Sequence, residues 1–250
     1  AGKTFLAAVT PALDRISITS MQLLEHTEPT ALRISAPPTF TMRWLIPRIS
    51  AFQRKRGGVE VKLTTSTAPV NFEDRIYDVA IRGSNQPIPG MLSVPFMTET
   101  IVPVCHPDLM ENGQLDYPKL LANHTLISYD TEPMAWSEWL SMASQPDLRV
   151  FHSLQFEQMY FALQAAAEGL GVVLVPLFLV VDDIIAGRMC APFGLLGARQ
   201  RRYYANASLS THESPIIAGF CEWLLKEGQD TEQSIDQWSS AMGWTPSMPS

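Results

Sequence analysis

The stretch FHSLQFEQMYFALQAAAEGLGVVLVP, from Phe151 to Pro176, has the pattern of a strand, a helix and a second strand. Apolar residues recur at three- and four-residue spacing through its middle, as on one face of a helix. Ser153 suits an N-cap, and Gly169 suits the left-handed conformation that ends a helix. The aliphatic residues from Val172 to Val175 predict a strand buried on both faces. We therefore expect a right-handed β-α-β unit, which binds ligands where strand ends meet helix N-termini.

Composition narrows the classes of function. The chain has 250 residues, 46% of them apolar and 17% charged, so it can form a sizeable core, and two lobes are expected rather than one. The net charge of −7 argues against binding of DNA or RNA by this chain. Such binding is driven by counterion release, which needs clustered lysine and arginine. The one dense basic run, Arg54-Lys55-Arg56, is interpreted as a solvated helix end.

Cysteine usage and hydropathy indicate the compartment. Cys105, Cys190 and Cys221 are widely spaced and form no Cys-x-x-Cys motif, which favours reduced, buried thiols in a cytosolic protein. No window approaches the roughly 18 consecutive apolar residues of a membrane span, and no export signal is recognisable. We expect a cytoplasmic protein that does not enter the membrane.

The two ends of the chain are predicted to lie outside the globular body. Residues 1–29 carry an apolar stripe from Phe5 to Leu24 that predicts a linker helix, kinked at Pro11. This helix packs either on the protein's own body or on a second copy, and the second copy is favoured. Residues 229–250 turn polar and irregular, so a loose tail is expected there.

Two α/β lobes are predicted between these ends, the first from residues 30–98 and 207–228 and the second from residues 99–206. In the first lobe, alternating apolar residues predict parallel strands near 32–36, 59–65 and 77–82, and a helix starts at Thr39 and bends at Pro47. Apolar runs at 94–97 and 101–104 predict two strands that cross between the lobes, and an extended run at 201–209 returns. The last helix is expected over 216–226.

Four segments together resemble the effector-binding domain of LysR-type transcriptional regulators. They are Leu32-Arg-Ile-Ser-Ala-Pro-Pro-Thr-Phe40, Trp44-Leu-Ile-Pro-Arg48 with Phe52, Tyr77-Asp-Val-Ala-Ile-Arg82, and Glu168-Gly-Leu-Gly-Val-Val-Leu-Val-Pro176. With Ala135-Trp136-Ser137-Glu138-Trp139, the pattern is most similar to the subgroup of the glycine-cleavage activator, the β-lactamase regulator and the tryptophan-synthase activator. The order and spacing of these segments carry the resemblance, which extends from residue 1 to about residue 227.

The resemblance implies a fold and a function. The fold is α/β, with two Rossmann-like lobes and a ligand cleft between them, as in type 2 periplasmic binding proteins, preceded by the linker helix. The function implied is sensing of a small metabolite to control transcription, in a homodimer or homotetramer that reaches promoter DNA through an N-terminal winged helix-turn-helix. That DNA-binding domain is absent from these residues, so the chain is interpreted as part of a longer regulator. No cofactor is implied.

Candidate effector-binding residues follow from the resemblance and from the hydroxyl groups beside helix N-termini, which suit a small anion. They are Ser35, Pro38, Thr39, Thr64, Thr65, Asn71, Arg82, Gln155, Phe156, Gln158 and Tyr204. Some have simpler roles open to them: Ser35 and Thr39 could cap a helix, Phe156 and Tyr204 could fill the core, and Arg82 could pair with an acidic neighbour. A carboxylate or an amino-acid-like effector is expected, although muropeptides and aromatic acids fit the same description.

A dimer interface is predicted from large apolar residues that exceed what one lobe's core should need. They lie on the helices at 39–55 and 216–226 and are Phe40, Trp44, Phe52, Phe220 and Trp223. If exposed, this spare stripe would be larger than monomers tolerate, and pairing of two copies is the commonest way to bury it. The alternative is that both stripes lie inside the lobe.

Catalysis and transport are the competing functions. The five histidines are scattered, and no His, Cys or carboxylate cluster has metal-ligand spacing, so no metal site is predicted. No Gly-x-Ser-x-Gly motif occurs, and Gly169-Leu170-Gly171 ends a helix rather than opening one, so it is not a dinucleotide or phosphate loop. An enzyme or a solute-binding transport protein on the same fold remains the alternative.

Overall fold

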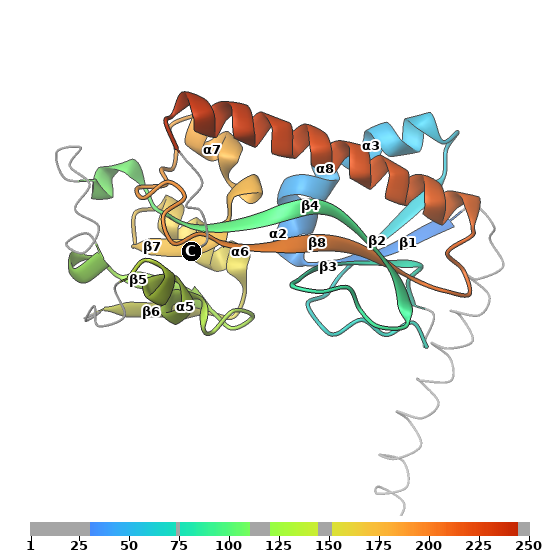
Figure 1. Cartoon of the computed structure of the whole chain (residues 1–250), viewed down its shortest axis with the longest axis horizontal. Coiled ribbons are helices and arrows are strands. Elements are labelled where there is room, and N and C mark those ends of the chain that lie inside the picture. The colour runs from blue at the N-terminus through green and yellow to red at the C-terminus, as the bar shows by residue number, and fades with distance from the viewer. Residues whose placement is uncertain (1–30, 74–75, 111–120, 145–151, 245–250) are drawn as a thin grey trace, which may run out of the picture.

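The computed structural model describes residues 31–73, 76–110, 121–144 and 152–244 (Figure 1). Within them, eight strands form a single mixed sheet in the order β2-β1-β3-β8-β4-β7-β5-β6. We call the end of this sheet with β2, β1 and β3 the first lobe and the end with β7, β5 and β6 the second lobe. The predicted linker helix at 1–29 lies outside the described residues.

The first lobe is built from three parallel strands and one long helix. Strands β1 (Ala31–Ala36), β2 (Glu60–Thr65) and β3 (Val79–Ser84) pair in parallel, with β1 in the centre, as the alternating apolar pattern predicted. The helix runs without a break through α2 (Pro38–Phe40), the π-helical stretch η1 (Thr41–Leu45) and α3 (Ile46–Lys55). The irregularity expected near Pro47 is therefore a wider turn just before the proline, which fits its missing N–H donor.

Two long antiparallel strands join the lobes, and we call this pair the hinge ribbon. Strand β4 (Met91–Val104) pairs with β8 (Arg199–Ser208) from Met91 opposite Ser208 to Ile101 opposite Arg199, with a bulge between Pro95 and Met97. The prediction of two separate strands at 94–104 was wrong, because the polar residues Thr98 to Thr100 continue the same ladder. The predicted crossing between lobes and the predicted return strand are both present.

The second lobe contains the β-α-β unit read from the sequence. Strands β6 (Ser153–Phe156) and β7 (Val172–Pro176) both pair in parallel with β5 (Leu126–Tyr129), and α6 (Met159–Ala167) connects them. Gly169 has φ +79, the expected helix-ending conformation, and β7 is buried throughout. Ser153 is not an N-cap, because it opens β6 and the helix begins six residues later.

Shorter helices complete this lobe. They are η2 (Pro107–Leu109), α5 (Ala135–Met142), η4 (Leu177–Leu179) and α7 (Val181–Ile185). Near the end of this lobe, Cys190 forms a single antiparallel bridge with Cys105.

The aromatic residues assigned to a dimer interface are inside the lobe instead. Phe40, Trp44, Phe52 and Phe220 are at most 1% exposed and Trp223 is 8% exposed. Phe40 stacks on Trp44 with ring centroids 5.0 Å apart, and Phe220 stacks on Trp223 at 5.6 Å. The prediction that these residues form an exposed apolar stripe was therefore wrong. Their rings fill the space between the two helices and the sheet.

The last helix, α8 (Pro215–Ala241), is much longer than predicted and replaces most of the expected loose tail (Figure 1). It lies across the hinge ribbon and extends from the first lobe toward the second. Gly228 does not end it, because the missing side chain lets the helix approach β4 closely, where an added Cβ would lie 1.9 Å from the Phe96 carbonyl oxygen. Glu232 accepts a hydrogen bond from the backbone N–H of Thr98 at 2.6 Å, and Trp244 packs over Gly194 of the second lobe.

This contact predicts that Gly228→Ala destabilises the domain. Alanine would gain about 1 kcal/mol of helix propensity, but overpacking against a backbone carbonyl costs roughly 3 kcal/mol, so we expect a net loss of about 2 kcal/mol. Urea unfolding followed by tryptophan fluorescence measures it. The matched control is Gln229→Ala, one residue along the same helix and exposed, which should change stability by less than about 0.5 kcal/mol. Equal stability of the two variants would contradict the close contact.

Candidate functional site

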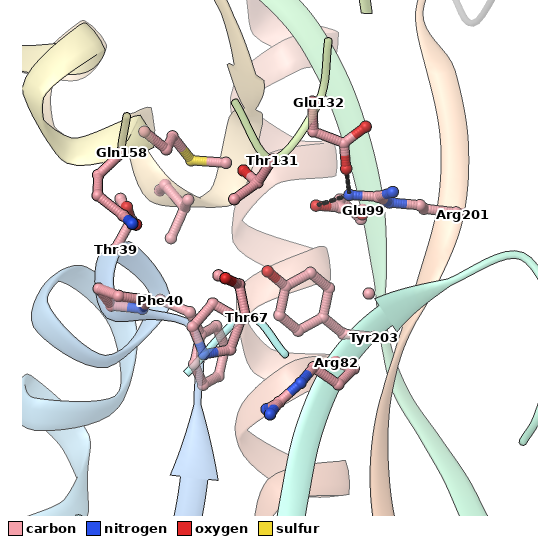
Figure 2. Close-up of a pocket in the computed structure, with 15 residues that line it drawn as sticks. Thr39, Phe40, Thr67, Arg82, Glu99, Thr131, Glu132, Gln158, Arg201 and Tyr203 are labelled. Carbon is pink, nitrogen blue, oxygen red and sulfur yellow. Dashed lines mark hydrogen bonds and ion pairs between the residues drawn. The ribbon is translucent and has the colours of Figure 1, made fainter. Parts of the chain in front are cut away.

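A cavity of about 220 Å³ with both polar and apolar lining residues lies between the two lobes, beside the hinge ribbon (Figure 2). It is small beside the 300–1,000 Å³ or so of drug-sized sites, so it suits a small metabolite. Its lining comes from both lobes and from the ribbon: Pro37, Pro38, Thr39, Phe40, Thr67, Arg82, Gly83, Glu99, Thr131, Glu132, Gln158, Met159, Leu179, Arg201 and Tyr203.

The first-lobe wall is the N-terminus of the long helix that begins at Pro38. The N–H groups of its first turn have no partner within the helix, and they carry the positive end of the helix dipole. Thr39 is 4% exposed, and its hydroxyl caps nothing, since Pro37 holds the cap position without a side-chain hydrogen bond. The capping alternative for Thr39 is therefore excluded, and its hydroxyl faces the cavity (Figure 2).

Arg82 adds a positive charge to the same wall. Its guanidinium donates to the carbonyl oxygens of Ala68, Ser35 and Ile81 at 3.1, 3.2 and 2.8 Å, and to the Ser35 hydroxyl at 3.1 Å. All of these acceptors are neutral, so Arg82 has no acidic partner among the described residues. Burial lowers the pKa of Arg82, but an arginine remains charged at neutral pH. The first-lobe wall is thus suited to an anion.

The ribbon supplies the opposite kind of group. Glu99 on β4 is fully buried and forms an ion pair with Nε of Arg201 on β8, whose Nη2 also lies 2.5 Å from Glu132 (Figure 2). Burial acts to lower the pKa of Arg201, but the two carboxylates outweigh it and raise the pKa. The carboxylate oxygens of Glu99 and Glu132 therefore bring hydrogen-bond acceptors to this wall of the cavity.

Tyr203 lies between the two charged walls, on the β8 position two residues after Arg201. Its ring packs edge-on against Phe178 and Phe96, and its hydroxyl points into the cavity (Figure 2). Burial raises the pKa of Tyr203 well above its usual value, and the carboxylate of Glu99 raises it further. The phenol therefore remains a neutral hydrogen-bond donor.

Four of the residues predicted from sequence lie on this cavity: Pro38, Thr39, Arg82 and Gln158. Ser35 is one step behind it, fully buried and bonded to Arg82. Thr64 and Thr65 lie outside it, because β2 is the edge strand, and only Thr67 in the following loop reaches the lining. Asn71 is exposed in that loop, where its side chain accepts from the Glu73 N–H at 2.8 Å.

The other residues predicted in the second lobe and the ribbon do not line the cavity. Gln155 donates to Asp130 at 2.6 Å and Phe156 packs against the core, so both leave the candidate site. Tyr204 is replaced by Tyr203, because neighbouring strand residues face opposite sides of a sheet. Sequence reasoning missed Glu99, Arg201 and Glu132. Glu99 could have been found from the sequence, because it is a charged residue between two apolar runs.

The family follows from comparison with known proteins. Residues 26–229 match the LysR substrate binding domain. The chain is 30% identical to the HTH-type transcriptional regulator PerR of Escherichia coli, covering 83% of this chain and 69% of that protein. It is 28% identical to the E. coli glycine cleavage system transcriptional activator, covering 94% and 77%.

Solved structures agree on the fold. The effector domain of AmpR from Pseudomonas aeruginosa superposes with a TM-score of 0.70 at 24% identity, covering 82% of this chain and 98% of that one. CrgA from Neisseria meningitidis gives a TM-score of 0.68 at 15% identity, covering 90% and 78%. At these identities the likeness shows a type 2 periplasmic-binding-protein-like fold.

This chain belongs to the LysR substrate-binding domain family. It is the effector-binding domain of a LysR-type transcriptional regulator, as its sequence motifs indicated. The proteins it matches are regulators rather than enzymes, and nothing in the comparisons favours a transport protein. In the part of the chain that the structure describes, no helix is long and apolar enough to cross a membrane, and no three His, Cys, Asp or Glu side chains gather as a metal site.

The buried phenol predicts a dependence of stability on pH. A tyrosine in the unfolded chain loses its proton near pH 10, whereas Tyr203 keeps it to higher pH in the folded chain. Its contribution is therefore complete below about pH 10 and is lost above it, with a slope near 1.4 kcal/mol per pH unit. Urea unfolding between pH 8.5 and 11, as about the accessible range, should show a shallower decline for Tyr203→Phe than for the parent. Parallel curves would contradict the assignment.

Proposed function

We propose that the interlobe cavity binds a small amino-acid-like metabolite, with its carboxylate toward the first lobe and its ammonium toward the hinge ribbon. The observation that carries this proposal is the difference between the two walls of the cavity. A helix N-terminus and Arg82 favour an anion on one side, and the carboxylate oxygens of Glu99 and Glu132 on the other can accept hydrogen bonds from an ammonium group.

The size of the site supports a small effector. A cavity of about 220 Å³ leaves little room for a muropeptide, and it favours an amino acid with a small side chain over a larger aromatic acid. Hydrogen bonds to charged groups contribute about 1.5–3 kcal/mol each, so two charged ends can supply most of the affinity of a small effector. The similarity to a regulator named for the glycine cleavage system is consistent with amino-acid metabolism.

The cavity also offers a route from binding to control of transcription. Residues from both lobes and from the ribbon line it, so a ligand that touches all of them changes the balance between open and closed arrangements of the lobes. In the complete regulator, which we place in the cytoplasm, an N-terminal winged helix-turn-helix would bind promoter DNA. A change in lobe closure would then alter the spacing of those DNA-binding domains within the oligomer.

Thr39 provides the test of the binding site. We expect glycine, L-alanine or L-serine to raise the Tm, because a ligand at about 100 times its Kd adds about 2.7 kcal/mol of stability. Thr39→Val removes one hydroxyl that caps nothing, so it should keep the parent Tm without ligand and weaken binding about tenfold or more. Thr64→Val, the same substitution outside the cavity, is the matched control and should bind as the parent does.

Two modified probes separate the ends of the ligand. Glycinamide lacks the carboxylate and acetate lacks the ammonium group, so neither should match the Tm shift of the amino acids. Acetate acting as well as glycine would leave only an anion site. If no amino acid shifts the Tm, the proposed effector class is wrong, although the family assignment stands.

We also propose that two copies associate through surfaces other than the buried aromatic rings. Met42 and Ile46 on the long first-lobe helix are 54% and 51% exposed, and Phe161 on α6 is 50% exposed. Exposed apolar side chains on one helix of each lobe suit an antiparallel pair of subunits, in which the first lobe of one copy meets the second lobe of the other.

Light scattering at micromolar concentration tests this association. The chain without residues 1–30 should have the mass of a dimer, and Phe161→Asp should shift it toward monomer because a buried charge without a partner is costly. Leu209→Asp is the control, since Leu209 is equally exposed at 56% but lies beyond the end of β8. A monomeric mass for the parent, or equal effects of both variants, would contradict the proposed faces.

A further inference from the structure

Two cysteines that are far apart in the sequence meet in the second lobe. Cys105 directly follows β4, and Cys190 lies between α7 and β8. Their backbones exchange two hydrogen bonds, from Cys105 N–H to Cys190 O at 3.0 Å and from Cys190 N–H to Cys105 O at 2.9 Å. Their sulfur atoms are 3.5 Å apart, and both are free thiols in this structure.

The backbone around this pair suits a covalent bond between the sulfurs. Residues that exchange both hydrogen bonds in an antiparallel pair have Cα atoms about 5.5 Å apart, which is within the range of about 4.4–6.8 Å found for disulfides. The side chains also project from the same face of the bridge, so rotation about their Cα–Cβ bonds brings the sulfurs together. The third cysteine, Cys221, is buried in α8 against the aromatic core of the first lobe.

We propose that Cys105 and Cys190 are a redox-active pair that forms a reversible disulfide on exposure to small organic disulfides. In the first step, the Cys190 thiolate attacks one sulfur of the organic disulfide and releases one thiolate. In the second step, the Cys105 thiolate attacks the Cys190 sulfur and releases the other. Two protein thiols are oxidised, one organic disulfide is reduced to two thiols, and the protons from both cysteines pass to the released thiolates.

The surroundings of the two sulfurs fit these separate roles. Cys190 is partly exposed and can meet a reagent from solvent, whereas Cys105 is completely buried. The hydrogen bond from Cys105 lowers the pKa of Cys190, which favours the thiolate. The pKa of Cys105 is raised by the same hydrogen bond and by burial, which suits the cysteine that reacts second. This division is that of an attacking and a resolving cysteine.

The position of the pair connects it to the hinge ribbon. Cys105 lies where β4 enters the second lobe, and the segment after Cys190 leads through Gly197 into β8. That segment is held by Trp139, whose indole N–H donates to the Leu196 carbonyl at 3.0 Å. A disulfide would therefore tie together the two chain segments that carry the ribbon into the second lobe, and it would restrain a long loop of the unfolded chain.

Incubation of the purified chain with glutathione disulfide tests the proposal. We expect an intact mass lower by two hydrogen atoms, a peptide that links Cys105 to Cys190, and a Tm raised by about 5 °C or more. Dithiothreitol should reverse all three changes. Cys190→Ser should abolish them, and Cys105→Ser should stop at a mixed disulfide on Cys190.

Cys221→Ser is the control and should behave as the parent does, since Cys221 is not part of the pair. Three results would overturn the proposal: both thiols remain free in excess glutathione disulfide, the parent stops at a mixed disulfide, or the linked peptide contains Cys221. If both serine variants fold poorly, alkylation settles the question in the parent chain. Protection of Cys105 and Cys190 together after oxidation supports the pair, and alkylation of both contradicts it.

Discussion

Strands β4 and β8 are hydrogen-bonded to each other from one lobe into the other, and this pairing limits how the two lobes can move. The lobes can change their relative orientation only by twisting or bending a ribbon of two strands, so closure and the shape of the cavity are coupled. The buried ion pair of Glu99 and Arg201 crosses that ribbon and faces the cavity. On the opposite side of the ribbon, α8 packs along β4 with no side chain at Gly228. Glu99 and Arg201 therefore belong both to the lining of the cavity and to the ribbon that joins the lobes.

Local patterns in the sequence were sufficient for most of the fold. The strand from Val172 is continuous in aliphatic residues and is buried, and Gly169 ends the preceding helix with a positive φ, as expected. The incorrect predictions concern residues whose structural role depends on a contact with a residue far away in the sequence. Glu99 interrupts an apolar run, but Arg201, which neutralises it, is far along the chain. Glycine often ends a helix, but Gly228 lies inside α8. Its missing side chain allows the close contact with the Phe96 carbonyl.

The sequence predicted residues of the candidate site only where the course of the main chain determines their position. The helix N-terminus places Pro38 and Thr39 at the cavity, and the end of a parallel strand places Arg82 there, whatever the side chains nearby. Resemblance to a family located the return strand but not its register, so it gave Tyr204 in place of Tyr203. The buried aromatic rings were misassigned for a related reason: the sequence shows that Phe40 and Trp44 are large and apolar, but not that rings from β4, β8 and α8 enclose them.

The central claim is that a zwitterionic metabolite spans the cavity between the first-lobe helix and the hinge ribbon. A crystal structure of the domain with the amino acid that raises its Tm most tests this claim directly. We expect ligand density with the carboxylate beside Thr39 and Arg82 and the ammonium beside Glu99 or Glu132. Density in the reverse orientation would contradict it. So would density confined to the larger hollow between the lobes that Met42, Arg43 and Tyr160 help to line.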